Sequence, residues 1–311
     1  MSPTIPPRSS LETPHGTIEF PAYVPVTTFG EKYPLDDLVR PYLPRLASAM
    51  MVSLHYAKQM QDRPPFPLLI DSGGFASLFK EFSVREHQKV GLLEHHSPAG
   101  LETTHPRDVL HFQEEYADIG FSLDFPIPPS MERSEASLRQ RLTIANALWA
   151  LKNRRRTSMR LFACVQGWDV DSYQTCAQAY VGQGFDGLAI GGLVPRMRNQ
   201  GELFKIVDRV RETDPTVPLH VFGLGKPALV QKLFARGVQS VDSSSYVKMA
   251  ADGKLWGQSG PGAKDISPTE RLHLALCNLA TATQSTMPLS SAPMMFRTRG
   301  LGSIRPVSGT G

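Results

Sequence analysis

Cysteine is scarce in this chain, because 311 residues contain only Cys164, Cys176 and Cys277. Three isolated cysteines exclude a disulfide framework and are typical of a reducing compartment. No two of them have the short spacing of a structural zinc site, so we expect no zinc or other metal. The first residues contain no apolar core of a signal peptide, and no apolar run approaches the roughly 18 residues of a membrane span. We therefore expect a cytoplasmic protein that does not enter membranes.

An excess of charge of one sign is also missing. The 33 Lys and Arg residues exceed the 29 Asp and Glu residues by only four, giving a formal net charge of +4. This mildly basic balance is compatible with a polyanionic partner but does not identify one. With 41% hydrophobic and 20% charged residues, the composition is that of an ordinary globular protein. The length suffices for a (β/α)8 barrel, which takes about 250 residues.

The two ends of the chain differ in composition from its middle. Residues 1–13 are rich in Pro, Ser and Thr, and residues 284–311 are rich in Ser, Pro and Gly. Such compositions favour segments without fixed structure. We expect a flexible N-terminal segment at 1–13, one domain at 14–283 and a disordered C-terminal tail at 284–311. No internal repeat at a fixed period is present.

Short apolar runs alternate with longer helical patterns through the middle of the chain, which predicts a parallel α/β fold. Three of the helical patterns end at Gly120, Gly184 or Gly237, a C-cap signature. An extended segment is expected at 17–26, strands at 67–70, 120–123, 161–165, 187–190, 219–222 and 240–241, and helices at 106–119, 134–156, 171–183, 201–213 and 227–237.

Polar residues or glycines follow each predicted strand at once. The six strand ends are followed by Asp71-Ser72-Gly73-Gly74-Phe75, Asp124, Gln166-Gly167, Gly191-Gly192, Gly223 with Gly225, and Asp242-Ser243-Ser244-Ser245. Acids, an amide and glycines at six successive strand ends are typical of the active-site face of a (β/α)8 barrel. A doubly wound sheet would concentrate its ligands at one switch point, so the pattern favours the barrel.

Each of these residues also has a structural interpretation. A lone Asp after a strand is more often a helix N-cap than a catalyst, and glycine pairs usually allow turns with positive φ. The convergence of three acids and an amide is harder to explain structurally, because like charges brought together destabilise a fold. Two carboxylates facing a small ligand indicate glycosidic chemistry, with one as nucleophile and the other handling protons. The remaining groups suit the edge and face of a purine, although a sugar ring stays open.

At these residues the chain resembles the tRNA-guanine transglycosylase superfamily, from about residue 16 to about residue 256. The order and spacing of the motifs carry the resemblance. They are DSGGF at 71–75, HPRDVLHFQEEYADIGFSLDFPIPP at 105–129, VQG at 165–167, FDGLAIGGL at 185–193, FGLGKP at 222–227 and RGVQSVDSSSY at 236–246.

The resemblance implies a role for each matching residue. Asp242 matches the nucleophile and Asp71 the general acid/base, while Phe75 matches the aromatic residue that stacks on the base. The implied reaction exchanges guanine in a nucleic acid for a 7-deazaguanine, such as 7-cyano-7-deazaguanine, without any cofactor. The residues implied in base binding are Ser72, Phe75, Asp124, Gln166, Gly191, Gly192, Gly223 and Gly225.

The chain also departs from the superfamily pattern. It has no candidate for the Cys/His zinc site that bacterial and eukaryotic tRNA enzymes carry after the nucleophile. Its DSSSY segment at 242–246 is more similar to the archaeal tRNA enzymes and to the DNA-guanine transglycosylases of 7-deazapurine DNA-modification systems. We therefore favour DNA as the substrate, with tRNA as the alternative. A non-catalytic subunit and a glycoside hydrolase are further alternatives, which the two retained acids and the DSGGF motif respectively disfavour.

The nucleic-acid backbone requires cations. We predict that Arg196 and Arg198 contact phosphates, because they follow the strand end at Gly191-Gly192. The densest basic run lies at 152–160 and either complements a helix C-terminus or binds nucleic acid. The expected partners are the nucleic acid and the 7-deazaguanine base, and also a second copy of the chain or accompanying modification proteins.

Overall fold

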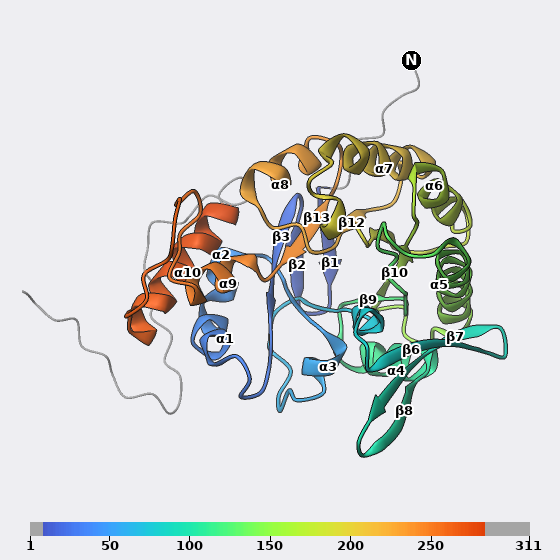
Figure 1. The fold of residues 1–311 in the computed structure, drawn as a ribbon, viewed down its shortest axis with the longest axis horizontal. Helices are drawn as coiled ribbons and strands as arrows, with labels where there is room; N and C mark the ends of the chain where they lie inside the picture. Colours follow the sequence, from blue (N-terminus) through green and yellow to red (C-terminus); the bar gives the residue numbers. More distant parts are fainter. Residues whose placement is uncertain (1–8, 284–311) are drawn as a thin grey trace, which may run out of the picture.

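Eight parallel strands close into a barrel in the computed structural model, which describes residues 9–283. The order around the ring is β10, β11, β12, β13, β3, β4, β5 and β9, and helices surround it (Figure 1). The predicted (β/α)8 fold is confirmed. The barrel strands are β3 (Ala22–Thr27), β4 (Met50–Val52), β5 (Leu68–Ile70), β9 (Ile119–Phe121), β10 (Arg160–Val165), β11 (Gly187–Ile190), β12 (Leu219–Val221) and β13 (Ser240–Ser243).

The helices pack outside the ring, mostly between one barrel strand and the next. Buried faces of the longer helices and the outward-facing strand residues together form the larger of two hydrophobic clusters. The α-helices are α1 (Pro34–Val39), α2 (Leu43–Leu46), α3 (Leu54–Ala57), α4 (Pro106–Tyr116), α5 (Arg133–Asn153), α6 (Val170–Gln178), α7 (Gln200–Thr213), α8 (Pro227–Phe234), α9 (Ser245–Ala251) and α10 (Pro268–Thr283), and the short 3-10 helices are η1 (Arg40–Tyr42), η2 (Gly74–Leu78) and η3 (Val194–Arg196).

The second hydrophobic cluster fills the barrel interior. It includes Leu69 of β5, Phe121 of β9 and Cys164 of β10. Because side chains alternate across a strand, the residue two positions beyond an inward-facing apolar residue also faces inward. This parity aims Asp71 and Gln166 into the mouth of the barrel, above the apolar layer.

Two small antiparallel sheets accompany the barrel. In the first, β1 (Ser10–Thr13) pairs with β2 (Gly16–Glu19), so the prediction that residues 1–13 lack fixed structure is wrong for residues 10–13. Backbone pairing with β2 and burial of Leu11 hold that segment. The rest of that prediction, for residues 1–8, and the predicted tail at 284–311 lie outside the described residues.

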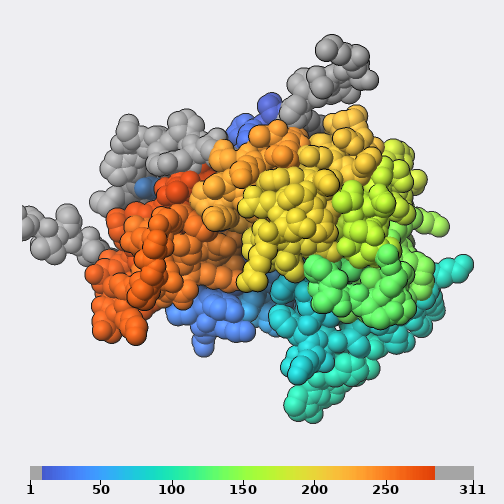
Figure 2. Space-filling model, turned by 45° about the horizontal axis from the view of Figure 1, so that its top comes forward, coloured from blue at the N-terminus to red at the C-terminus, as the bar shows by residue number. Residues whose placement is uncertain are grey.

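The second sheet is an insertion between β5 and α4 that was not predicted. It consists of β6 (Phe82–His87), β7 (Val90–Ser97) and β8 (Gly100–Thr104). The sheet packs against α5 through β7. Its far end projects from the barrel (Figures 1 and 2). Within residues 9–283, no helix is long and apolar enough to cross a membrane.

Candidate active site

The carboxyl ends of the barrel strands surround a cavity of about 350 Å³. Nine of the ten residues predicted for catalysis or base binding line it, which is the clustering expected at this face of a (β/α)8 barrel. These nine are Asp71, Ser72, Phe75, Asp124, Gln166, Gly191, Gly192, Gly223 and Asp242. The tenth, Gly225, lies outside the lining. A Cβ atom there would come within 2.3 Å of the Ser243 side chain, so its small size serves packing rather than ligand contact.

Asp71 follows β5 at the cavity wall. Its Oδ1 accepts hydrogen bonds from the backbone N–H groups of Leu54, at 3.1 Å, and Gly73, at 2.9 Å. Burial raises the pKa of this carboxyl from its usual 3.8 to about 7, and the neighbouring carboxylates Asp242 and Asp124 add to the rise. A carboxyl with this pKa can hold or release a proton near neutral pH, as a general acid/base must.

Asp124 is buried beside Ser72 and Gln166. Its Oδ1 accepts a hydrogen bond from Ser72 Oγ at 2.7 Å, and its Oδ2 accepts one from Gln166 Nε2 at 2.7 Å. Burial raises the pKa of the Asp124 carboxyl, while these two hydrogen bonds oppose the rise. The two donors fix the orientation of the carboxyl at the cavity floor.

Gln166 leaves one polar atom unused. With Nε2 bonded to Asp124, its buried Oε1 has no hydrogen-bond partner among the described residues. An unpartnered buried acceptor is unfavourable unless a ligand supplies a donor. The cavity therefore contains an acceptor suited to a ligand N–H group.

The two glycines after β11 have different roles. The Gly191 N–H donates to Val165 O at 3.1 Å, so this amide is already used within the barrel. A Cβ at Gly191 would lie 2.1 Å from Gln166 Nε2, which explains the need for glycine beside the amide. Gly192 adopts a φ of +70° and is the better source of an N–H for a ligand.

Asp242 lies on β13 and is buried. Its Oδ1 accepts a hydrogen bond from the Gly223 N–H at 3.1 Å and lies 3.1 Å from His220 Nε2. The second carboxylate oxygen, Oδ2, accepts no hydrogen bond from any other residue within 9–283. One oxygen is thus held by the protein, while the other is available to a ligand.

Two aromatic side chains line the cavity. Phe75, on η2, is 60% exposed and contacts Phe79 edge-to-face with ring centroids 5.7 Å apart. Phe222 follows β12, and its ring lies 4.9 Å from Phe121 in the barrel interior. An exposed ring at a cavity mouth offers a face on which a flat ligand can stack.

The prediction that Arg196 contacts phosphate is wrong in this structure. Its side chain is only 1% exposed, and its guanidinium donates to four backbone carbonyls. The sequence position after β11 suggested a surface residue, but η3 turns Arg196 inward under the loops. Arg198 is exposed, and its contact with phosphate stays a prediction.

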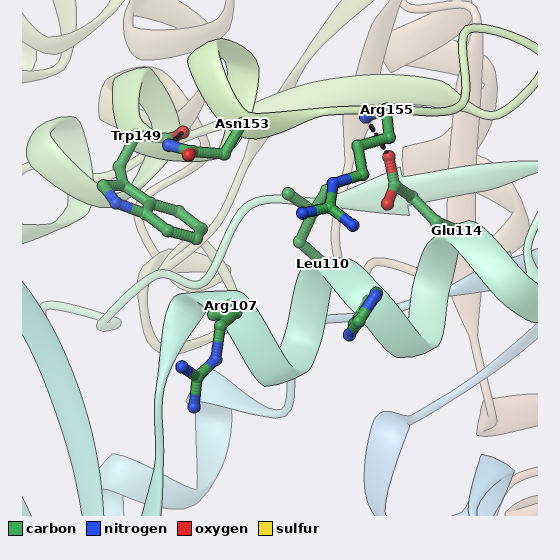
Figure 3. Close-up of a pocket in the computed structure, with 7 residues that line it drawn as sticks. Arg107, Leu110, Glu114, Trp149, Asn153 and Arg155 are labelled. Atoms are coloured by element: carbon green, nitrogen blue, oxygen red, sulfur yellow. Dashed lines mark hydrogen bonds between the residues drawn. The ribbon is translucent and has the colours of Figure 1, made fainter.

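Most of the basic run at 152–160 has structural partners. Arg154 and Arg160 both pair with Asp186, and the backbone N–H of Arg155 donates to Glu114 (Figure 3). The run lies between the end of α5 and the start of β10, hence at the amino ends of the strands, opposite the cavity. A small cleft there is lined by Arg107, Leu110, His111, Glu114, Trp149, Asn153 and Arg155.

Within residues 9–283, no three His, Cys, Asp or Glu side chains group so as to hold a metal ion. The polar side chains that line the cavity are carboxyl, amide and hydroxyl groups. The absence of zinc stays a prediction.

Sequence reasoning missed His220. This histidine is fully buried in β12, where its ring contacts both Asp242 and Ser240. The available signal was its place two residues before Phe222 in the run LHVF, which gives it the same inward parity.

Comparison with known proteins agrees with the motifs. Residues 7–291 match the family described as TGT, queuine tRNA-ribosyltransferase. The chain is 29% identical over 293 residues to the queuine tRNA-ribosyltransferase of a Thermoanaerobacter species, covering 84% of this chain and 75% of that protein. It is 28% identical over 267 residues to the tRNA-guanine(15) transglycosylase of Methanothermobacter thermautotrophicus, covering 80% of this chain and 37% of that protein.

A second archaeal relative, the tRNA-guanine(15) transglycosylase of Methanococcus aeolicus, is 30% identical over 168 residues. That alignment covers 52% of this chain and 26% of the relative, so the chain spans well under half the length of these archaeal proteins. The family match includes every described residue of the barrel, in agreement with the motifs at its strand ends. The chain therefore belongs to the queuine tRNA-ribosyltransferase family, within the tRNA-guanine transglycosylase superfamily.

Proposed function

We propose that this protein is a guanine transglycosylase that exchanges a guanine base in tRNA for a free 7-deazaguanine. One observation carries the proposal: Asp71 and Asp242 converge on one cavity whose floor also offers Asp124 and Gln166. The two acids suit displacement at a glycosidic carbon, and the floor suits the hydrogen-bonding edge of guanine.

Base recognition rests on acceptors and a stacking face. The Asp124 carboxylate and the unpartnered Gln166 Oε1 are acceptors, and the N1/N2 edge of guanine presents donors. The Gly192 N–H is a donor for a base carbonyl, and Phe75 stacks on the base. A base held this way has to leave the nucleic-acid stack before it reaches the cavity.

The chemistry proceeds in two displacements. Asp242 Oδ2 attacks C1′ of the target guanosine, the C1′–N9 bond breaks, and the departing guanine takes the proton held by Asp71. The incoming base then returns its N9 proton to Asp71, attacks C1′ and breaks the ester bond to Asp242. Two inversions retain the β configuration, and the kinetics are ping-pong.

The choice of polymer follows the comparisons. The archaeal and bacterial relatives are named as tRNA enzymes, which supports tRNA as the substrate over DNA, the polymer that the DSSSY segment favoured. A group near the 2′ position would distinguish ribose from deoxyribose, since RNA offers a hydroxyl there. DNA is therefore retained as the second substrate to test.

The test is incorporation of radiolabelled guanine, and separately of 7-cyano-7-deazaguanine, into bulk tRNA and into plasmid DNA in parallel. Asp242→Asn serves as the inactive variant, and Asp171→Asn, on the exposed first turn of α6, is the matched control. We expect label in tRNA with wild type and Asp171→Asn only. Label in DNA alone would show that the substrate is DNA. No label in either polymer would refute the transglycosylase assignment.

A further inference from the structure

His220 contacts Asp242, the proposed nucleophile, from the barrel interior. It is 0% exposed, and its Nε2 lies 3.1 Å from Asp242 Oδ1 while its Nδ1 lies 2.8 Å from Ser240 Oγ. The register of β12 and β13 pairs His220 directly with Ser240, which explains the second contact. Ser240, His220 and Asp242 thus form a hydrogen-bonded chain inside the barrel.

The partners restrict the protonation of the imidazole ring. If Nδ1 carried the only proton, the lone pair of Nε2 would face a carboxylate oxygen, which is repulsive. Nε2 must therefore carry a proton and donate to Asp242, while the Ser240 hydroxyl satisfies Nδ1. The other close neighbours of the ring, Phe121 at 5.2 Å and Phe222 at 4.8 Å between centroids, offer no competing polar atom.

We propose that His220, held by Ser240, is a positioning residue for the nucleophile Asp242, an inference that rests on the proposed function. His220 Nε2–H and the Gly223 N–H both donate to Oδ1, so Oδ2 is the oxygen that bonds to C1′. In the second displacement the C1′–Oδ2 bond breaks and its electron pair returns to the carboxylate. The two donors on Oδ1 stabilise that returning charge, as fixed donors do for developing oxyanions.

A histidine with only a structural role would contribute the volume of its ring, and a hydrogen-bond donor at Nε2 would not be required. The distinction lies between His220→Leu, which removes the donor, and His220→Gln, whose side-chain amide N–H can reach a similar place. Ser240→Ala removes the partner that holds the tautomer but keeps the ring. The three variants separate ring volume from hydrogen bonding.

The experiment measures steady-state guanine exchange and the covalent adduct on denaturing gels, with thermal unfolding as the fold control. We expect His220→Leu to lower kcat about 10²-fold, the loss typical of one fixed donor. The KM for guanine should change less than about threefold, because the base pocket is untouched. His220→Gln should recover most of kcat, and equal activity of folded Leu and Gln variants would overturn the proposal.

A second measurement does not depend on the catalytic activity of the protein. Nitrogen NMR of protein labelled with ¹⁵N-histidine reports which ring nitrogen carries a proton. We expect a protonated Nε2 in wild type, and an unprotonated Nε2 would overturn the positioning role. If wild type exchanged no base into any polymer, the proposed function would fail while this readout still judged the His220–Asp242 contact.

Discussion

Asp71→Asn is expected to remove activity and raise stability at the same time. The substitution preserves size and keeps an oxygen at the position where Asp71 Oδ1 accepts from Leu54 and Gly73. It removes the ionisable proton, so exchange should fall by about 10²–10⁴-fold, the usual contribution of a positioned acid/base.

The stability change follows from the raised pKa. Asp71 titrates at about 7 in the folded protein against a usual 3.8, so the folded state resists ionisation of this group. Above the unfolded pKa, ionisation in the unfolded state therefore destabilises the fold, and the penalty grows until pH exceeds about 7. The full difference of about 3 pKa units corresponds to about 4 kcal/mol at 1.36 kcal/mol each.

Asn removes this penalty because it does not ionise. Urea unfolding of wild type and Asp71→Asn should show a stability advantage for the variant that grows by about 3 kcal/mol between pH 5 and pH 9. Ser72→Ala, which leaves Asp71 in place, controls for a local change in the turn. A variant that is less stable at every pH, or an advantage independent of pH, would refute the buried-acid reasoning.

Three other outcomes follow from the site. Asp242→Asn should abolish exchange and form no adduct on denaturing gels, and an adduct at wild-type level would show that another residue is the nucleophile. Gly191→Ala should raise the KM for guanine at least about tenfold, because its Cβ would displace the Gln166 amide; an unchanged KM would mean that Gln166 does not read the base. Activity should persist in chelator, and one zinc per chain by metal analysis would contradict the zinc-free assignment.

The location of the polar residues at the strand ends was predictable, because strand parity sets which side chains face inward and barrel topology brings all the carboxyl ends to one face. Asp71, Asp124, Gln166 and Asp242 each follow an apolar run, and parallel strands bring their carboxyl ends to one face. Strand β4 was missed because Met50–Val52 is only three residues long and is followed by a lone serine, Ser53, and not by an acid, an amide or a glycine. Gly120 was mistaken for a helix C-cap. It lies in β9, where a Cβ would come within 2.8 Å of Gln113 Oε1.

The inserted sheet escaped prediction for a different reason. The turn between β6 and β7 uses Gln88 and Lys89 at positive φ, where hairpins usually signal themselves with Asn and Gly. The charged residues of β6 also obscure the alternation of apolar and polar residues that would indicate a strand. The direction of the Arg196 side chain could not be predicted either, because an arginine six residues past the end of β11 can face solvent or the protein with no difference in the local sequence.

Arg196 connects three loops at the cavity. Its guanidinium donates to Ile127 O after β9, to Gly167 O and Trp168 O after β10, and to Gly192 O after β11. The forked geometry of arginine suits several carbonyls at once, whereas the ammonium of lysine is a single point charge. Arg196 therefore holds the turns that carry Gln166 and Gly192.

Arg196→Lys should accordingly weaken the base pocket rather than nucleic-acid binding. We expect the KM for guanine to rise at least about tenfold, since a loss of about 1.4 kcal/mol in positioning has that effect. The salt dependence of tRNA binding should stay unchanged, while Arg198→Ala should reduce its slope by about one, because only the exposed side chain can release a counterion. Measuring the KM for guanine and the dissociation constant for tRNA from 50 to 200 mM salt separates the two roles. A reduced slope in Arg196→Lys with an unchanged KM for guanine would mean that this arginine turns outward and binds phosphate after all.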